Sequence, residues 1–353
     1  MEDYNLYGSE TISDIPLDYF SNKEKNQDSL ENNENHNPNN FDINNIINNS
    51  FNFHELAKKH GFKEKNVKTI LNKSKENRGV FLGDYSLNPY LGCSFDCKYC
   101  YINGSKYAGS TKSFYIKSNA LDILKNQLKR KSKTGERGII LFGSATDPYI
   151  DIEKELFLTR DLLKIANRFR FPIHLVTKSD LVLRDIDLFK KINKNGLLPK
   201  DIEHLDSKVM ITFSFSSLDE KVAKIFEPNV PNLNRRLKAI KKLKDEKFLV
   251  GVSLMPLLPF ISDSYNAIDK FVSIFSDIGV DYIFGGPLTL FGDGNNDSKT
   301  KYYKILNENF PKFVEPTKNI FKEKDYPNIN YQNNIYKNLE NVCRRYNIKN
   351  SIV

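Results

Sequence analysis

The sequence has few cysteines and no long apolar run. Four cysteines in 353 residues are too few for a disulfide scaffold, and such sparse use is typical of a reducing compartment. No apolar run approaches the roughly 18 residues that span a bilayer. The opening stretch, MEDYNLYGSE, lacks the basic and apolar regions of a signal peptide. We therefore expect a soluble, cytoplasmic protein that does not enter a membrane.

The charge is distributed unevenly along the chain. The net charge is +9, but residues 1–50 hold ten Asp and Glu against two Lys, so the rest carries 51 Lys and Arg against 34 Asp and Glu. This balance of +17 suits contact with a polyanion such as nucleic acid. The alternative is that the lysines only form the solvated faces of helices. Residues 1–50 also hold thirteen asparagines and few large apolar side chains, which predicts an acidic disordered tail.

From residue 84 onward, short apolar strands alternate with amphipathic helices. The predicted strands cover residues 85–91, 138–142, 172–176, 209–215, 249–255 and 282–284, and the predicted helices cover 121–131, 153–168, 186–193, 233–243 and 268–275. This alternation predicts an α/β fold with a parallel sheet and crossover helices. Six units indicate a partial (β/α)6 barrel of the TIM-like kind. We divide the chain into a tail (1–50), a lead-in (51–83), the barrel (84–290) and a helical C-terminal extension (291–353).

Three of the four cysteines lie in one stretch, NPYLGCSFDCKYCY. Cys93, Cys97 and Cys100 can converge on one inorganic cluster but cannot easily bond one another. Iron–sulfur clusters usually take four thiolates, so three would leave one iron open to a chelating small molecule. The alternative is a zinc site, which usually needs four ligands. None of the five histidines lies inside this loop, so folding would have to bring Cys343 or a distant histidine to it.

This stretch resembles the radical S-adenosylmethionine (SAM) superfamily, and the string NPYxGCxxxCxYCY is similar to its spore photoproduct lyase-like (DNA repair photolyase-like) branch. The resemblance covers about residues 66–345 and implies a (β/α)6 core. It implies a [4Fe–4S] cluster on the three cysteines, with SAM on the fourth iron. It also implies reductive cleavage of SAM to a 5′-deoxyadenosyl radical that abstracts hydrogen from a substrate, and an electron donor such as a flavodoxin or ferredoxin.

Polar residues follow the predicted strands, at the edge where barrels place their reacting groups. By the resemblance, Gly143, Ser144 and Thr146 after the second strand are candidate contacts for the amino group of SAM. Asp147 beside them is alternatively a helix cap or a turn residue. Further candidate SAM contacts after the third, fourth and fifth strands are Lys178, Ser179, Ser214 and Met255. Here the alternatives are a surface lysine and a core methionine.

Two further sets of residues bear on the chemistry. Tyr99 and Tyr101 flank a cysteine, and a phenol can relay a hydrogen atom or simply pack against the cluster. Glu227, followed by Arg235 and Arg236, also matches the pattern of the family. The resemblance implies a structural ion pair between Glu and Arg that orients the helix or, alternatively, a contact of Arg235 to SAM or to a substrate phosphate.

One departure from the family pattern leaves the substrate open. Spore photoproduct lyases carry a hydrogen-donating cysteine near the end of the second strand, whereas this chain has Ser144 there. Repair of thymine photoproducts therefore does not follow from the resemblance. A nucleic-acid lesion lyase and a non-catalytic, metal-stabilised nucleic-acid-binding protein remain the alternatives.

Overall fold

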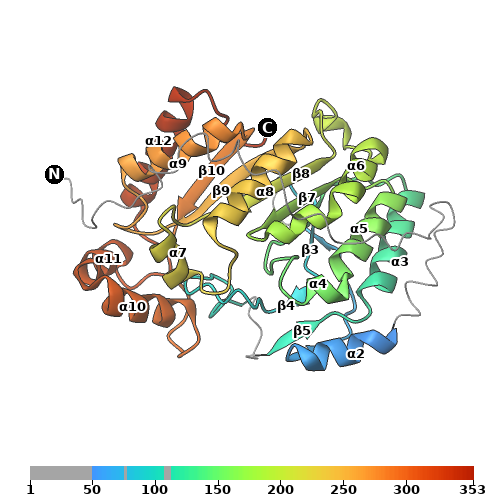
Figure 1. Ribbon diagram of the computed structural model, residues 1–353, viewed down its shortest axis with the longest axis horizontal. Coiled ribbons are helices and arrows are strands. Elements are labelled where there is room, and N and C mark those ends of the chain that lie inside the picture. The colour runs from blue at the N-terminus through green and yellow to red at the C-terminus, as the bar shows by residue number, and fades with distance from the viewer. Residues whose placement is uncertain (1–49, 75–77, 107–112) are drawn as a thin grey trace, which may run out of the picture. The chain divides into compact units, whose positions relative to one another are not determined.

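The computed structural model describes residues 50–353 except 75–77 and 107–112. The acidic tail predicted for residues 1–50 thus lies outside the described residues, apart from Ser50. In the described part, a central sheet is flanked by helices, and the C-terminal helices α10 and α11 lie at the opposite side from α3 and α5 (Figure 1).

The central sheet has seven strands in the order β10-β9-β8-β7-β6-β3-β2. Its parallel strands are β3 (Tyr85–Leu87), β6 (Ile140–Phe142), β7 (Ile173–Thr177), β8 (Val209–Ser214), β9 (Leu249–Leu257) and β10 (Tyr282–Pro287). Only β2 (Asn72–Lys73) pairs antiparallel, with β3. Six parallel strands adjacent in chain order confirm the predicted α/β partial barrel. Every residue of β8 is buried, as expected for a strand with both faces covered.

Helices cross from each parallel strand to the next along the outer face of the sheet (Figure 1). The crossover helices are α3 (Ala120–Lys133), α4 (Glu153–Leu156), α5 (Leu158–Arg168), α6 (Ile186–Asn195), α7 (Glu220–Phe226), α8 (Leu233–Asp245) and α9 (Tyr265–Ile278). The 3-10 turns η3 (Asp180–Asp185) and η4 (Lys200–Ile202) lie among them. In α3 the buried residues are Leu121, Leu124 and Leu128, together with Ala120. This spacing forms the apolar stripe that a helix needs to cover a sheet.

A smaller sheet, which the sequence did not predict, lies beside the barrel. It consists of β1 (Phe62–Glu64), β5 (Phe114–Ile116) and β4 (Tyr90–Leu91), and helix α2 (Ser50–Lys59) packs on β1. The rings of Phe62 and Phe114 lie 5.3 Å apart, centroid to centroid. This sheet fixes β4, which leads directly into the cysteine loop.

The C-terminal region is helical, as predicted. It contains α10 (Ser298–Asn309), η5 (Pro311–Phe313), α11 (Val314–Phe321) and α12 (Ile329–Arg345). The rings of Tyr302 and Phe310 stack on Phe226 of α7 at 5.5 and 5.9 Å, so aromatic packing joins this region to the barrel. Cys343 is buried on α12, and its thiol lies 3.9 Å from the Ile283 carbonyl oxygen. Among the described helices, none is both long and apolar enough to cross a membrane.

Candidate functional site

The cysteine loop follows β4 and is anchored to the end of helix α7. Gly92 begins the loop with φ +80°, a left-handed conformation that favours glycine. The Lys98 backbone N–H donates to the Phe226 carbonyl at 2.8 Å, and the Asn229 side chain donates to the Ser94 carbonyl at 2.9 Å. One backbone and one side-chain hydrogen bond therefore fix the loop to the fourth βα unit.

A carboxylate within the loop ties it to the C-terminal helices. Asp96 accepts from Lys98 at 2.5 Å and from Lys301 of α10 at 2.9 Å. Partial burial raises the pKa of Asp96, but the hydrogen bonds from both lysines outweigh it and lower that pKa overall. The loop is thus held from two directions, by α7 and by α10.

The three loop cysteines line one cavity of about 560 Å³ at the carboxyl ends of the strands. Burial raises the pKa of all three thiols, to about 12 for Cys93, where the nearby Asp147 also raises it. Buried thiols of this kind become thiolates when metal ions supply compensating charge. The cavity is therefore suited to a metal cluster rather than to a free thiolate nucleophile.

Most of the predicted site residues line this same cavity. They are Tyr99, Tyr101, Gly143, Ser144, Lys178, Ser214 and Met255. Two others lie behind the cavity wall. Thr146 is buried, and its backbone N–H donates to the Asn88 side chain at 3.1 Å. Ser179 caps η3 by accepting from the Leu181 N–H at 3.3 Å. The structure thus places Thr146 and Ser179 in supporting positions.

Gly143 lets two strand ends approach each other. Its φ is +90°, and a Cβ built on it would lie 2.2 Å from the Val176 carbonyl oxygen and 3.0 Å from Pro148. No side chain fits there without moving the backbone of β7. The residue therefore needs glycine for both its conformation and its contact.

Asn88 and Asp147 organise the strand ends. The side-chain oxygen of Asn88 accepts from the N–H groups of Ala145 at 2.9 Å and Thr146 at 3.1 Å, and its amide nitrogen donates to Ser144 Oγ at 3.0 Å. Asp147 accepts from Thr177 Oγ1 at 2.8 Å and from the Lys178 N–H at 2.7 Å. It therefore links the ends of β6 and β7. Burial raises the pKa of Asp147 to about 6.

Glu227 is the centre of a buried polar cluster, of which the sequence predicted only an ion pair with an arginine. Its carboxylate lies 2.9 Å from Lys178 Nζ and 3.1 Å from Arg236 Nη2, and it accepts from Ser216 Oγ at 2.7 Å and from the Tyr99 hydroxyl. The ion pair that the sequence predicted between Glu227 and one of two adjacent arginines forms with Arg236, whereas Arg235 pairs with Asp180 at 2.8 Å. The period of the α-helix explains why the two arginines have different partners, because adjacent residues of α8 point in different directions.

The two tyrosines of the loop differ in environment. Tyr99 is buried, with its hydroxyl on Glu227, whereas Tyr101 is 43% exposed and donates to the Ser144 carbonyl. Burial, and then the charge of Glu227, raise the pKa of Tyr99 well above its usual value. Tyr99 is thus a neutral donor, and both phenols line the cavity wall.

The donor set around the cavity fits a cluster together with a polar ligand. Ser253 Oγ is buried at the wall and has no hydrogen-bond partner among the described residues. Within the described part of the chain, no set of three or more His, Cys, Asp or Glu side chains converges on a single metal ion. Cys343, the fourth ligand that a zinc site would recruit, lies on α12 against Ile283. Three separate thiols that line one cavity can ligate three irons of a polynuclear cluster, one thiolate fewer than such clusters usually have.

Comparison with known proteins identifies a family. The sequence model of the radical SAM superfamily matches residues 87–272. An uncharacterised protein of Methanocaldococcus jannaschii is 28% identical over 240 residues, which are 65% of this chain and 78% of that protein. An uncharacterised protein of Acidianus two-tailed virus is 27% identical over 259 residues, which are 67% and 80% of the two chains.

The fold is also similar to that of solved structures. One is spore photoproduct lyase complexed with dinucleoside spore photoproduct, with a TM-score of 0.53 and 20% identity over 80% of this chain and 77% of that chain. Another is a mutant of that lyase with bound AdoMet and dinucleoside spore photoproduct, with a TM-score of 0.51, 19% identity and the same coverage. At this identity the likeness shows a shared fold.

Proposed function

The chain belongs to the radical SAM superfamily, and from that premise we propose that it holds a [4Fe–4S] cluster on Cys93, Cys97 and Cys100 and cleaves SAM reductively. When bound, the cluster supplies the electron that converts SAM to methionine and a 5′-deoxyadenosyl radical, which abstracts hydrogen from the substrate. The observation that carries the proposal is that three cysteines and several polar strand ends line one cavity. The barrel, residues 84–290 in our division, supplies all the thiols.

The strand ends supply the contacts for SAM in this proposal. Gly143 lines the cavity after β6, and Ser144, Ser214 and Ser253 contribute hydroxyl-bearing side chains to the same wall. Ser253 Oγ, which lacks a partner among the described residues, is free to bond a polar group of the ligand. Met255 is 36% exposed at the cavity and offers an apolar surface for the adenine.

Two basic residues, Lys178 and Arg236, supply positive charge near the cavity wall. Lys178 and Arg236 share the single carboxylate of Glu227, so these three residues together carry one positive charge, which Asp147 beside Lys178 partly offsets. In the proposal this charge attracts the carboxylate of SAM, while Lys178 stays paired. An isolated lysine there would instead have to bear the desolvation cost alone.

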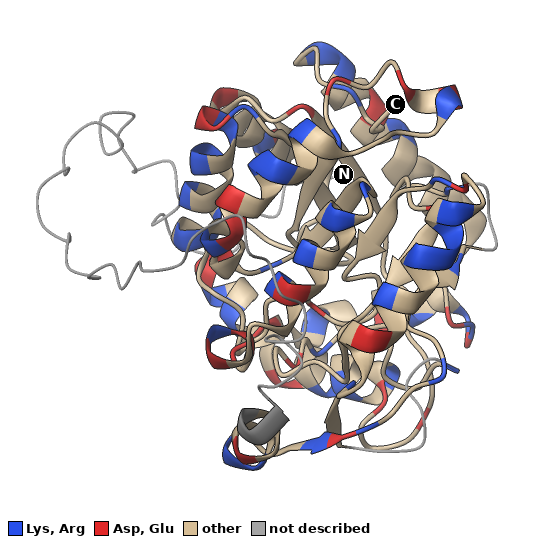
Figure 2. Ribbon diagram, turned by 90° about the vertical axis from the view of Figure 1, so that its right-hand side faces the viewer, with Lys and Arg blue, Asp and Glu red and all other residues tan. Residues whose placement is uncertain are grey.

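Tyr101 and Tyr99 are proposed hydrogen donors of unequal accessibility. Tyr101 is half-exposed at the cavity, so its phenol reaches a bound substrate. Tyr99 is buried behind it on Glu227 and positions the loop. The substrate remains unassigned, with a nucleic-acid lesion as one candidate. Figure 2 shows the side of the molecule that lies at the right of Figure 1. On that side Lys and Arg are spread over several helices and mixed with Asp and Glu, rather than gathered in a single stripe.

An anaerobic assay tests the proposal. The protein is reconstituted with iron and sulfide, reduced chemically and by a flavodoxin or ferredoxin, and mixed with SAM. We expect about four irons per chain, an electron resonance signal that SAM alters, and 5′-deoxyadenosine as a product. A cluster whose spectrum ignores SAM, with no deoxyadenosine formed, would refute the radical chemistry and leave a structural or redox role.

A further inference from the structure

A second cavity lies between helices α10 and α11 and the turn that follows α11. Its volume is about 730 Å³, and Tyr303, Phe321 and Leu290 contribute to its walls. Binding pockets for small molecules typically occupy about 300–1,000 Å³. The pocket is therefore large enough for a ligand with one ring system and a polar tail. None of its lining residues takes part in the cysteine cavity.

The two cavities share one wall. Leu288, Thr289 and Phe291 line the cysteine cavity, and Leu290 between them lines the second pocket. The Leu290 N–H donates to the Asp325 carbonyl at 2.7 Å, which fastens this wall to the turn after α11. A ligand in the second pocket therefore lies directly behind the segment that faces the reactive cavity.

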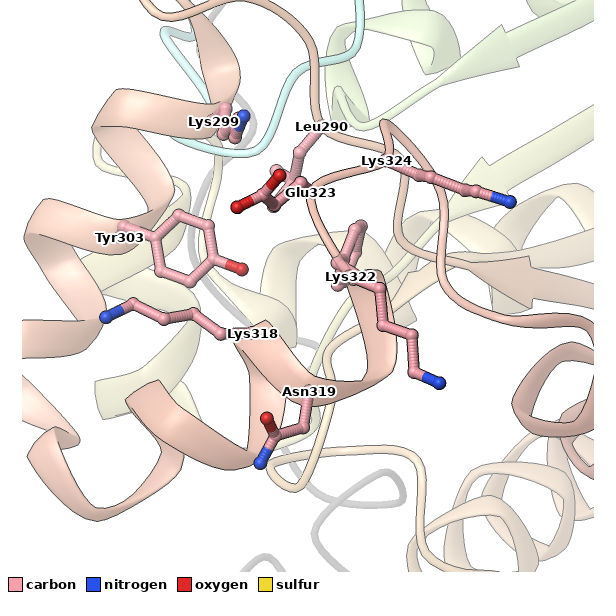
Figure 3. Close-up of a pocket in the computed structure, with 9 residues that line it drawn as sticks. Leu290, Lys299, Tyr303, Lys318, Asn319, Lys322, Glu323 and Lys324 are labelled. Carbon is pink, nitrogen blue, oxygen red and sulfur yellow. The ribbon is translucent and has the colours of Figure 1, made fainter.

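The interior of the pocket combines apolar walls with two polar groups. The Tyr303 hydroxyl and the Glu323 carboxylate point toward its middle (Figure 3). Burial, followed by the charge of Glu315, raises the pKa of Tyr303 to about 12, so its hydroxyl is a neutral donor. An aromatic wall beside one carboxylate suits a flat heterocycle, because the carboxylate can accept from its amino group or from a sugar hydroxyl.

Four lysines surround this interior, and among the described residues two of them form an ion pair with a carboxylate while two do not. Lys299 pairs with Asp293 at 2.9 Å, and Lys318 pairs with Glu315 at 2.7 Å. Lys322 and Lys324 are exposed, and their ammonium groups point outward from the pocket (Figure 3). Among the described residues, no carboxylate forms an ion pair with either of them. They are therefore available to an anion at the mouth.

The backbone of the turn is strained at this point. Lys322 has φ 45° and Glu323 has φ 64°, so two consecutive non-glycine residues adopt the left-handed conformation. Each such residue costs on the order of 1 kcal/mol. The turn places Glu323 inward and the lysines on either side of it outward (Figure 3). One left-handed residue would have sufficed to end the helix.

We propose that this pocket binds one nucleotide unit. The base packs against Tyr303 and Phe321, Glu323 accepts from a base amino group or a ribose hydroxyl, and the phosphate meets Lys322 and Lys324. A free nucleotide and a nucleotide within a single strand present the same chemistry here. The proposal does not depend on the radical chemistry, because binding alone tests it.

Calorimetric titration of the full chain tests the proposal. The ligands are adenosine 5′-monophosphate, inorganic phosphate and a single-stranded oligonucleotide of eight residues. The test variant is Lys322→Ala/Lys324→Ala. The matched control is Lys129→Ala/Lys133→Ala, which removes the same charge from the C-terminal half of α3 on the opposite side (Figure 1). We expect the monophosphate to bind about tenfold more weakly to the test variant, and unchanged to the control.

A second pair of variants isolates the aromatic contact. Tyr303→Ala should weaken monophosphate binding about tenfold because stacking is lost, whereas Tyr303→Phe should retain most of the affinity. If the oligonucleotide binds far more tightly than the monophosphate, with a steeper dependence on salt, the nucleotide that the pocket binds belongs to a single strand. Equal affinities mean that the pocket binds a free nucleotide. Either result supports the site. Equal binding of phosphate and monophosphate, no binding at all, or an unaltered affinity in Lys322→Ala/Lys324→Ala overturns it.

Discussion

Lys178 and Glu227 form an ion pair at the cavity wall, with 2.9 Å between Nζ and Oε1, and their side chains are 13% and 1% exposed. Burial raises the pKa of Glu227, but the charges of Lys178 and then Arg236 outweigh it and lower that pKa to about 2. The carboxylate is thus ionised at any pH where the protein works. It connects three parts of the protein, because it contacts Lys178 after β7, Arg236 on helix α8 and Tyr99 in the cysteine loop.

Replacing Glu227 should therefore destabilise the whole fold. Glu227→Gln leaves two buried cations without a carboxylate, which typically costs about 3–5 kcal/mol. Urea unfolding monitored by circular dichroism measures this loss. Glu246→Gln is the control, because Glu246 pairs with Lys190 and Lys242 at the surface and such pairs contribute little. Equal urea midpoints for Glu227→Gln and the unaltered protein would show that the cluster does not hold the fold together.

Gly143→Ala should damage the site more than its backbone conformation alone predicts. Gly135 has φ +72° and open space around it, whereas Gly143 has φ +90° and a carbonyl oxygen 2.2 Å from the point where a Cβ would lie. Gly135→Ala should cost about 1–2 kcal/mol, the penalty for the left-handed conformation. Gly143→Ala should cost clearly more and should weaken SAM binding, measured by calorimetry. Similar costs for the two variants would mean that β7 moves freely to make room.

Most of what the sequence could predict came from two patterns. These are the alternation of strands and helices and the spacing of the cysteines. Strands such as β7 and β8 begin and end within one residue of their predicted bounds, because buried apolar runs are strong local signals. The predictions were wrong where tertiary contacts, rather than the local sequence pattern, determine where a helix or strand ends. The helix predicted over 153–168 breaks at Phe157, where φ is 55°. The buried Glu153 carboxylate accepts there from the Thr159 N–H at 3.0 Å and so begins a second helix.

The end of β9 shows the same limit. The sequence predicted that Pro256 ends the strand, but β9 continues to Leu257. Pairing with β8 stops at Ser253, so beyond it β9 is bonded only to β10. A proline is tolerated where one side of the strand has no partner, since its missing N–H breaks no ladder bond there. The sequence likewise left open which of the two adjacent arginines pairs with Glu227, because that depends on how helix α8 is rotated against the sheet.

The two kinds of cysteine should respond differently to substitution. Cys97→Ala removes one cluster ligand, so we expect loss of the cluster's visible absorption and at least about a hundredfold less deoxyadenosine. Cys343→Ala removes a small buried group on α12, so it should lower stability modestly and leave the iron content unchanged. Iron analysis and absorption spectra separate the two outcomes. Loss of iron from Cys343→Ala would instead make that residue a fourth cluster ligand and leave no open iron for SAM.

The buried His174 should make stability fall in mild acid. Its ring donates to the Phe81 carbonyl and lies 2.6 Å from Thr212 Oγ1, and burial lowers its pKa to about 4. In the unfolded chain a histidine has a pKa of about 6.5. Between these values the unfolded state binds a proton that the folded state does not. The contribution is therefore complete above about pH 6.5 and is lost as the pH falls toward 4, to a limit of about 3 kcal/mol.

Urea unfolding at several pH values tests this linkage against a histidine at the surface. The stability difference between the unaltered protein and His174→Gln should shrink by about 1.4 kcal/mol per pH unit between roughly pH 6 and 5, because every other titrating group is present in both. His204→Gln, at an exposed position, is the surface substitution for comparison. Parallel pH profiles for His174→Gln and the unaltered protein would mean that the ring becomes protonated inside the fold. The chain from His174 through Thr212 to Tyr282, whose hydroxyl lies 2.7 Å from Thr212 Oγ1, would then have to accommodate a cation.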